Sequence, residues 1–254
     1  MDPLLALVLL ASDIVHFEWR TLDVILLSDN TGSPNSRGNP SSLTNVKIIY
    51  ASGWGFAALK NDGTVYAWGD AYYGSCNVPS GLSNVKELYS ADHAYTALLN
   101  DDSLRAWGTY GGNVPSALTQ PGVGIATVTA ARLAFAALKK DGTVVAWGAM
   151  SAHGSSEPGG MTNIKAVYST NYAFTVLKND GTVTSWGGNN FGNVAPSNLQ
   201  NVVSVYASDT AFVALKSDGT LHSWGDASKG GLIPSNLATE SFVNVWGTTV
   251  YRSQ

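Results

Sequence analysis

The chain has 254 residues, which suits one large all-β domain or two smaller domains. Hydrophobic residues make up 44% of the sequence, as in globular proteins, whereas charged residues make up only 13%. The formal net charge of −4 and the lack of any lysine or arginine run argue against nucleic-acid binding, which needs a basic surface. A single cysteine, Cys76, excludes an intrachain disulfide framework.

The N-terminal segment contains a short apolar run, Leu4 to Leu10. It lacks the basic flank and the cleavage site of a secretory signal peptide. The run is also too short to cross a bilayer as a helix. We expect it to form a buried strand, and contact with a hydrophobic partner is the alternative.

Five copies of one phrase follow, the first being "ALKNDGTVYAWGD" at residues 58–70. The units that contain them start at Val46, Val85, Ile125, Ile164 and Val202. Each unit has a tryptophan 22 residues after its start, at Trp68, Trp107, Trp147, Trp186 and Trp224. Successive tryptophans are 39, 40, 39 and 38 residues apart, so the length varies only after the tryptophan. A core of fixed length followed by a variable loop is typical of stacked repeats.

Each unit contains three predicted strands. In the first unit, "VKIIY" at 46–50 places Val46, Ile48 and Tyr50 on one face of a short strand, "GFAALK" follows at 55–60, and "TVYAWG" at 64–69. Asp-Gly at 62–63, 141–142, 180–181 and 218–219 predicts a two-residue hairpin turn between the second and third strands. The second unit has Asp102 and Ser103 there, so we expect a different or strained turn. Segments with proline, such as "NVPSGL", suit an edge strand or a connecting loop.

Three or four antiparallel strands in about 40 residues form a propeller blade. We therefore predict an all-β fold, a closed β-propeller of short antiparallel blades, as a single domain over residues 1–254. The predicted repeats span about 4–45, 46–84, 85–124, 125–163, 164–201 and 202–242, with a partial unit at 243–254. Pairing of Val24–Leu27 with Val250–Ser253 would close the ring from both termini and gives six blades, which we favour. Seven blades are the alternative.

These motifs resemble the regulator-of-chromosome-condensation (RCC1-like) repeat propeller superfamily. The units are most similar to its short-blade branch, which includes the propeller-type β-lactamase inhibitor protein and the "AFAALK-DG-V-WG" repeat proteins of algae. The resemblance implies the fold and says little about function. One departure concerns the pair before "AL", commonly His-Ser in the family. Here a small residue precedes an aromatic one, at Gly55-Phe56, Ala94-Tyr95, Ala134-Phe135, Ala173-Phe174 and Ala211-Phe212.

The sequence contains no pattern of a catalytic, metal or phosphate site. None of the four histidines lies at metal-ligand spacing from another histidine, a cysteine or a carboxylate. The repeated aspartates of the Asp-Gly pairs are explained by turn chemistry. We therefore expect no enzymatic activity, no metal and no cofactor.

Two zones differ among the units and are the predicted location of specificity. One is the two-residue connection between the first and second strands, and the other follows the tryptophan. Aromatic residues of the kind enriched at interaction hot spots occur in both zones. The alternative is that these rings cap blade ends or pack between blades. The candidate partner-binding residues are Trp54, Tyr72, Tyr73, His93, Tyr110, Arg132, His153, Tyr172, Phe191 and Lys229.

These patterns favour a non-enzymatic protein–protein interaction module, an accessory or peripheral subunit that docks on a larger assembly. The alternative is a soluble or secreted inhibitor or a lectin-like binder. We expect protein partners and no nucleic acid. A plastid location is considered only for an algal source, and the sequence identifies no particular partner.

Overall fold

The structure is a computed structural model that describes residues 43–73, 76–149, 157–188 and 191–234 with their side chains. It also describes the backbone of residues 36–37, 242–246 and 249–252. The predicted strands Leu4 to Leu10 and Val24 to Leu27 lie outside the described residues, as does Ser253.

Each of the five complete units folds into a three-stranded antiparallel meander, as predicted. The first strands are β2 (Val46–Ala51), β5 (Val85–Ser90), β8 (Ile125–Ala130), β11 (Ile164–Ser169) and β14 (Val202–Ala207). The second strands are β3 (Gly55–Lys60), β6 (Ala94–Leu99), β9 (Ala134–Lys139), β12 (Ala173–Lys178) and β15 (Ala211–Lys216). The third strands are β4 (Val65–Asp70), β7 (Leu104–Gly108), β10 (Val144–Gly148), β13 (Val183–Gly187) and β16 (Leu221–Gly225).

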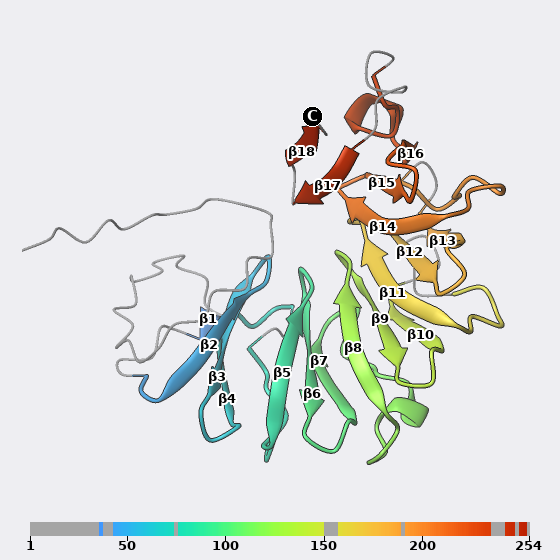
Figure 1. Cartoon of the computed structure of the whole chain (residues 1–254). Coiled ribbons are helices and arrows are strands. Elements are labelled where there is room, and N and C mark those ends of the chain that lie inside the picture. Colours follow the sequence, from blue (N-terminus) through green and yellow to red (C-terminus); the bar gives the residue numbers. More distant parts are fainter. Residues whose placement is uncertain are drawn as a thin grey trace, which may run out of the picture.

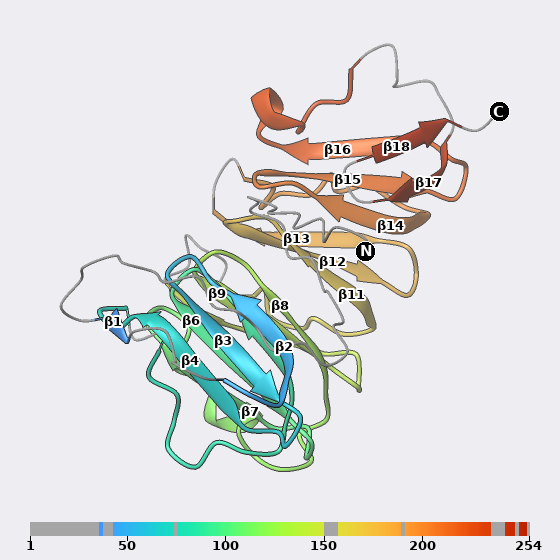
Figure 2. The ribbon, with the colours of Figure 1, turned by 90° about the vertical axis from the view of Figure 1, so that its left-hand side faces the viewer.

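The sheets follow one another in chain order along an arc (Figure 1). Figure 2 shows the arc from the side, with the sheet β2–β4 in front and the sheet β14–β16 at the other end. A short strand β1 (Ser36–Arg37) extends the first sheet beside β4, and β17 (Phe242–Trp246) pairs with β18 (Thr249–Arg252) after the last complete unit. The partial unit thus forms an antiparallel hairpin. The all-β prediction is confirmed over the described residues.

The proline segments are connecting loops, one of the two alternatives that the sequence left open. Residues 77–79 have no regular secondary structure. The equivalent loop of the second unit contains a 3-10 turn, η1 (Ser116–Leu118), whose Leu118 is buried. A second 3-10 turn, η3 (Ala227–Lys229), follows β16.

The Asp-Gly hairpins form, but their turns are longer than the predicted two residues. Gly63 N donates to Lys60 O at 3.0 Å, and Lys60 N donates to Thr64 O at 2.9 Å. Within this loop only Gly63 has a positive φ, 77°. The loop therefore has three residues, a turn followed by a left-handed residue, which is another common hairpin connection. In the second unit the equivalent pair is Asp101-Asp102, so the assignment of Asp102-Ser103 from the sequence was wrong by one residue. Asp102 takes the glycine position with φ 62°, so the turn keeps its geometry with a residue that tolerates it less well than glycine.

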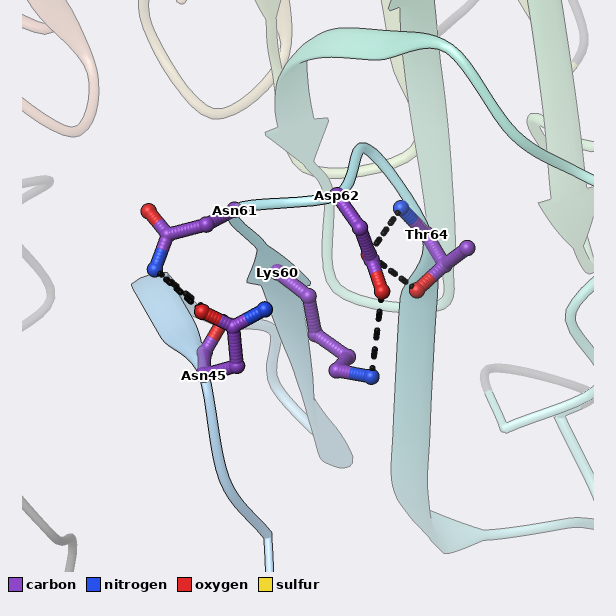
Figure 3. A network of polar contacts seen from close by, with 5 residues as sticks. All are labelled: Asn45, Lys60, Asn61, Asp62 and Thr64. Carbon is purple, nitrogen blue, oxygen red and sulfur yellow. Dashed lines mark hydrogen bonds and ion pairs between the residues drawn. The ribbon is translucent and has the colours of Figure 1, made fainter.

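The aspartate of each turn organises the loop, as Figure 3 shows for Asp62. Its Oδ1 accepts hydrogen bonds from Thr64 N at 2.9 Å and Thr64 Oγ1 at 2.6 Å, and Lys60 Nζ lies 3.3 Å from its Oδ2. The hydrogen bonds from Thr64 are the main cause that lowers the pKa of Asp62 to about 2. Equivalent bonds occur at Asp101, Asp141, Asp180 and Asp218. These contacts support the interpretation of the aspartates as turn residues.

The core lies between successive sheets. The repeated tryptophans are 4–7% exposed, and each stacks on the aromatic residue of the second strand at 5.4–5.5 Å between ring centroids. Trp147 belongs to a buried cluster that also contains Leu98 and Leu104 of the preceding unit. The tryptophans therefore fill the space between neighbouring units, as predicted. The departure from the family pattern before "AL" supplies the second ring of each stack.

Backbone hydrogen bonds join the units at the end that carries the Asp-Gly turns. The glycine carbonyl accepts from the first residue of the next unit: Val85 N to Gly63 O at 3.0 Å, Ile164 N to Gly142 O at 3.0 Å, and Val202 N to Gly181 O at 2.9 Å. We call this end of the sheets the turn end. The opposite end, called the tip end below, carries the loops after the first strands and after the tryptophans.

Candidate functional site

The loops between the first and second strands are joined across units by a backbone ladder at the tip end. Asp92 N donates to Arg132 O at 2.9 Å, Arg132 N to Asn171 O at 3.0 Å, and Asn171 N to Asp209 O at 2.9 Å. Each loop is itself closed by a hydrogen bond, such as Ala91 N to Ala94 O at 2.9 Å. The variable residues of four units therefore project from a continuous, hydrogen-bonded backbone.

Five rings from the first two units form one connected group, which we call the aromatic cluster: Trp54, Tyr72, Tyr73, His93 and Tyr110. Tyr73 is central, with centroid distances of 4.1 Å to His93, 5.1 Å to Trp54 and 5.1 Å to Tyr72. His93 also lies 6.0 Å from Trp54 and 5.7 Å from Tyr110. The contacts to Tyr72, and those of His93 with Tyr73 and Tyr110, are edge-to-face, a favourable arrangement of aromatic rings.

The cluster has a partly buried base and an exposed outer layer. Tyr73 and His93 are partly buried, whereas Trp54 is 47%, Tyr110 53% and Tyr72 75% exposed. The rings thus pack against each other and still present apolar surface to solvent. The inner rings Tyr73 and His93 pack between units, which was one of the two alternatives for these aromatics, and the outer rings remain accessible to solvent.

The backbone of Tyr110 has an unusual conformation. Its φ is 59°, in the left-handed region that bulky residues rarely adopt. Its ring contacts His93, and its carbonyl oxygen lies close to Gly148, where a Cβ would come within 2.8 Å of it. A small depression beside Tyr110 is lined by backbone of Gly108, Gly112 and Gly148. A residue in this conformation persists only where the surrounding structure holds it in place. Such residues are concentrated at functional sites.

Next to the aromatic cluster, Arg132 of the third unit and Tyr172 of the fourth unit form a second, polar group at the tip end. Arg132 Nε donates to Asp92 Oδ2 at 2.7 Å, and Arg132 Nη1 donates to the hydroxyl of Tyr172. The guanidinium carbon lies 5.7 Å from the centroid of the Tyr172 ring, which in turn lies 4.6 Å from Phe191. Asp92 and Tyr172 both hold the pKa of Arg132 above its ordinary value through hydrogen bonds. This guanidinium is therefore charged and fixed in place.

His93 is the titratable ring of the cluster. Burial is the main cause that lowers its pKa below the ordinary value, Asp92 and Asp70 oppose the shift, and Arg132 adds to it. Its Nδ1 atom is buried without a hydrogen-bond partner among the described residues. The ring therefore favours the neutral form and behaves as an aromatic contact.

Eight of the ten predicted site residues thus lie in two adjoining groups, the aromatic cluster and the Arg132 group with Tyr172 and Phe191. Lys229 lies at the tip end of the fifth unit in η3 and is exposed, apart from both groups in the contacts of the described residues. His153 lies outside the described residues. Asp92 is a further member that the sequence analysis did not single out, and its place beside His93 in the variable loop was the signal for it.

Within the part of the chain that the structure describes, no group of three or more histidine, cysteine, aspartate or glutamate residues could hold a metal ion. The same part of the chain contains no helix that is long and apolar enough to cross a membrane.

Comparisons with known proteins show similarity at the level of structure. No family model matches the sequence, and no curated protein matches it. The structure of Prp20p from Saccharomyces cerevisiae matches with a TM-score of 0.51 and 20% identity, over 71% of this chain and 57% of that one. The structure of Kap60 bound to yeast RCC1 (Prp20) matches with a TM-score of 0.54 and 19% identity, over 81% of this chain and 62% of that one.

A plant ectodomain gives a similar result. The ectodomain of the receptor kinase CR4 from Physcomitrella patens matches with a TM-score of 0.51 and 17% identity, over 80% of this chain and 57% of that one. The chain thus spans 57–62% of the length of these three structures. At such identities the likeness concerns the fold alone. The repeated sheets and this likeness together show that the chain has the fold of an RCC1-like β-propeller.

Proposed function

We propose that this protein is a non-enzymatic interaction module that binds a partner protein through the aromatic cluster and the adjoining Arg132 group. The observation that carries the proposal is the connected set of rings from Trp54 to Tyr110, three of which are about half exposed or more. Exposed tryptophan and tyrosine on a rigid backbone provide large contact area at a low cost in side-chain entropy.

The similar structures support this class of function. One of them concerns Prp20p and its binding to Gsp1p and histones, and another shows Kap60 bound to yeast RCC1 (Prp20). Those partners bind a protein that is longer than this chain and only 19–20% identical to it. The support therefore concerns protein binding by this fold and no particular partner. We propose further that the chain serves as an accessory or peripheral subunit of a larger assembly.

We also propose that residues 1–254 form one propeller domain of six short blades, in the manner of the short-blade branch. The hairpin β17–β18 has the same register irregularity near its start as the first hairpins of the complete units, between Phe242 and Asn244. A third strand from Val24–Leu27 would complete this unit. Cysteines introduced at positions 26 and 250 test the closure, and we expect them to form a disulfide rapidly in the folded protein. If neither this pair nor pairs at neighbouring positions form a disulfide, closure by these strands is excluded.

The function is tested by cross-linking in a native extract, followed by mass spectrometry. We expect cross-links from photoreactive residues placed at positions 54, 72 and 110 to other proteins. A matched probe at position 203 serves as the control, because Val203 is 44% exposed and lies at the turn end of β14. Equal labelling from both ends of the sheets, or labelling from neither, would contradict a binding face at the tip end.

A further inference from the structure

The lysines of the described units gather at the turn end of the sheets, which also carries the turn aspartates. Eight of the nine lysines of the chain lie at the turn end, at positions 47, 60, 86, 139, 140, 165, 178 and 216. At the tip end the described loops contain Arg132 and Lys229 as cations. The same loops contain five carboxylates: Asp70, Asp92, Glu157, Asp209 and Asp226. The tip end is therefore acidic as well as aromatic.

The aromatic cluster lies where carboxylates and exposed rings coincide. Asp70 ends β4 and accepts a hydrogen bond from Tyr72 N at 2.6 Å, which fixes the carboxylate next to the most exposed ring. Asp92 precedes His93 in the loop, and both aspartates act on His93 through their charge. Trp54 and Tyr110 both contact the His93 ring, on which the two aspartates act, and present exposed ring surface at this end. This environment favours a cation over the ring faces.

The chain itself contains an example of this chemistry on the same face. The Arg132 guanidinium lies over the Tyr172 ring at 5.7 Å and pairs with Asp92 at 2.7 Å. A ring and a carboxylate thus bind one cation within the face. Trp54, Tyr72 and Tyr110 are exposed rings on the same face, and their ring contacts in the described residues include no lysine or arginine.

We propose that the aromatic cluster binds a basic segment of the partner protein, with a lysine or arginine side chain over the exposed rings of Trp54 and Tyr110. This inference rests on the proposed function and adds the chemistry of the partner. The excess of carboxylates over cations at the tip end supplies the long-range attraction, and the ring faces supply the short-range contact. Arg132 adjoins the cluster through its ion pair with Asp92, whereas the eight turn-end lysines lie at the opposite end of the sheets.

The experiment uses synthetic peptides and the tryptophan fluorescence of the full chain. The five repeated tryptophans are at most 7% exposed, so the difference between the wild type and Trp54→Phe reports on Trp54. The probe is a ten-residue Gly-Arg repeat. Its controls are the same repeat with neutral citrulline, and with glutamate, in place of arginine. We expect saturable binding of the arginine peptide alone, weakened by added salt.

Variants then locate the binding. Tyr110→Ala and Trp54→Ala should each weaken it about two- to five-fold, which is the effect of one exposed cation–ring contact. Asp92→Asn should weaken binding, whereas the matched Asp218→Asn at the turn end should leave it unchanged. Thermal unfolding of each variant shows whether it is folded, and the peptide comparison on the wild type does not depend on any variant.

Three results would overturn the inference: no binding of the arginine peptide, equal binding of the citrulline peptide, or unchanged affinity in folded Trp54→Ala and Tyr110→Ala. Proteins cross-linked at the tip end together with any of these results would leave the proposed function in place and refute only the basic partner. If no protein is cross-linked there either, both proposals fail.

Discussion

Trp147 Nε1 donates a hydrogen bond to the carbonyl oxygen of Gly111, 36 residues earlier in the chain, at 3.1 Å. Trp224 donates in the same way to Gly192 O at 3.2 Å. Each of these tryptophans therefore binds the loop that follows the tryptophan of the preceding unit. The variable loop is fixed by the next unit, although its length differs between units.

The close packing of this loop predicts the effect of a small substitution. A Cβ at Gly111 would lie 2.5 Å from Cε2 of the buried Phe135 ring. We expect Gly111→Ala to reduce the free energy of unfolding by about 1–3 kcal/mol, the usual cost of overpacking a core. Urea denaturation measures the change. Gly159→Ala is the control, since a Cβ there meets nothing within 4 Å, and an equal loss in both variants would contradict the explanation.

The conformation of Tyr110 predicts a conflict between stability and binding. Its left-handed φ of 59° destabilises the folded state by on the order of 1–3 kcal/mol, and glycine adopts this φ without that cost. Tyr110→Gly also loses the edge-to-face contact with His93, about 0.5–1.5 kcal/mol. We therefore expect this variant to unfold at the wild-type temperature or slightly above, and to bind the arginine peptide more weakly.

Tyr72→Gly provides the comparison, because Tyr72 is not among the residues with positive φ. This variant should lose stability through the added freedom of the unfolded chain. Thermal unfolding of both variants tests whether Tyr110 is strained. If Tyr110→Gly is markedly destabilised and Tyr72→Gly is not, the conformation of Tyr110 is unstrained.

The turns at the other end require glycine in four of the five units. Gly142 has φ 79°, a region that costs an alanine roughly 1–2 kcal/mol. We expect Gly142→Ala to reduce the free energy of unfolding by about that amount in urea denaturation. Asp102→Gly should change stability little, because relief of its φ of 62° is offset by loss of its ion pair with Lys140. A neutral Gly142→Ala would contradict the role assigned to the turn.

The turn aspartates predict a loss of stability in acid. The pKa of Asp62 is lowered to about 2 in the folded chain, below its ordinary value near 4. A carboxyl whose pKa is lower in the folded state stabilises the fold above its ordinary pKa and loses this contribution as the pH falls through the folded value. We therefore expect stability to decline between about pH 4 and pH 2. Urea denaturation at several pH values should show a weaker decline in Asp62→Asn, and an unchanged profile would refute this linkage.

Much of the fold is predictable from the sequence, because the same pattern of apolar residues, Asp-Gly pairs and tryptophans occurs in five copies and the positions they share stand out. The tryptophan spacing, the alternation in "VKIIY" and the Asp-Gly pairs predict the three strands of each unit, which the structure confirms. The predicted length of the Asp-Gly turn was wrong, because an Asp-Gly pair occurs both in the two-residue turn and in the observed three-residue loop, where only the glycine has a positive φ.

The site was predictable in its residues and unpredictable in its contacts. Trp54 and Tyr73 belong to the first unit and His93 to the second, and the stacking of the two units brings the His93 ring within 4.1 Å of Tyr73 and 6.0 Å of Trp54. The pairing of Arg132 with Asp92 spans 40 residues and depends on the ladder between loops. No sequence pattern within a single unit contains this information.

The backbone ladder from Asp92 to Asp209 has a consequence for the design of new specificities. Because its hydrogen bonds involve main-chain atoms alone, side chains at positions 93, 133, 172 and 210 can be exchanged without removing any of them. Each of these units thus contributes one variable position to the same backbone frame. A library that varies these positions should yield folded proteins with different ligands, in the way that antibody loops vary on a constant scaffold.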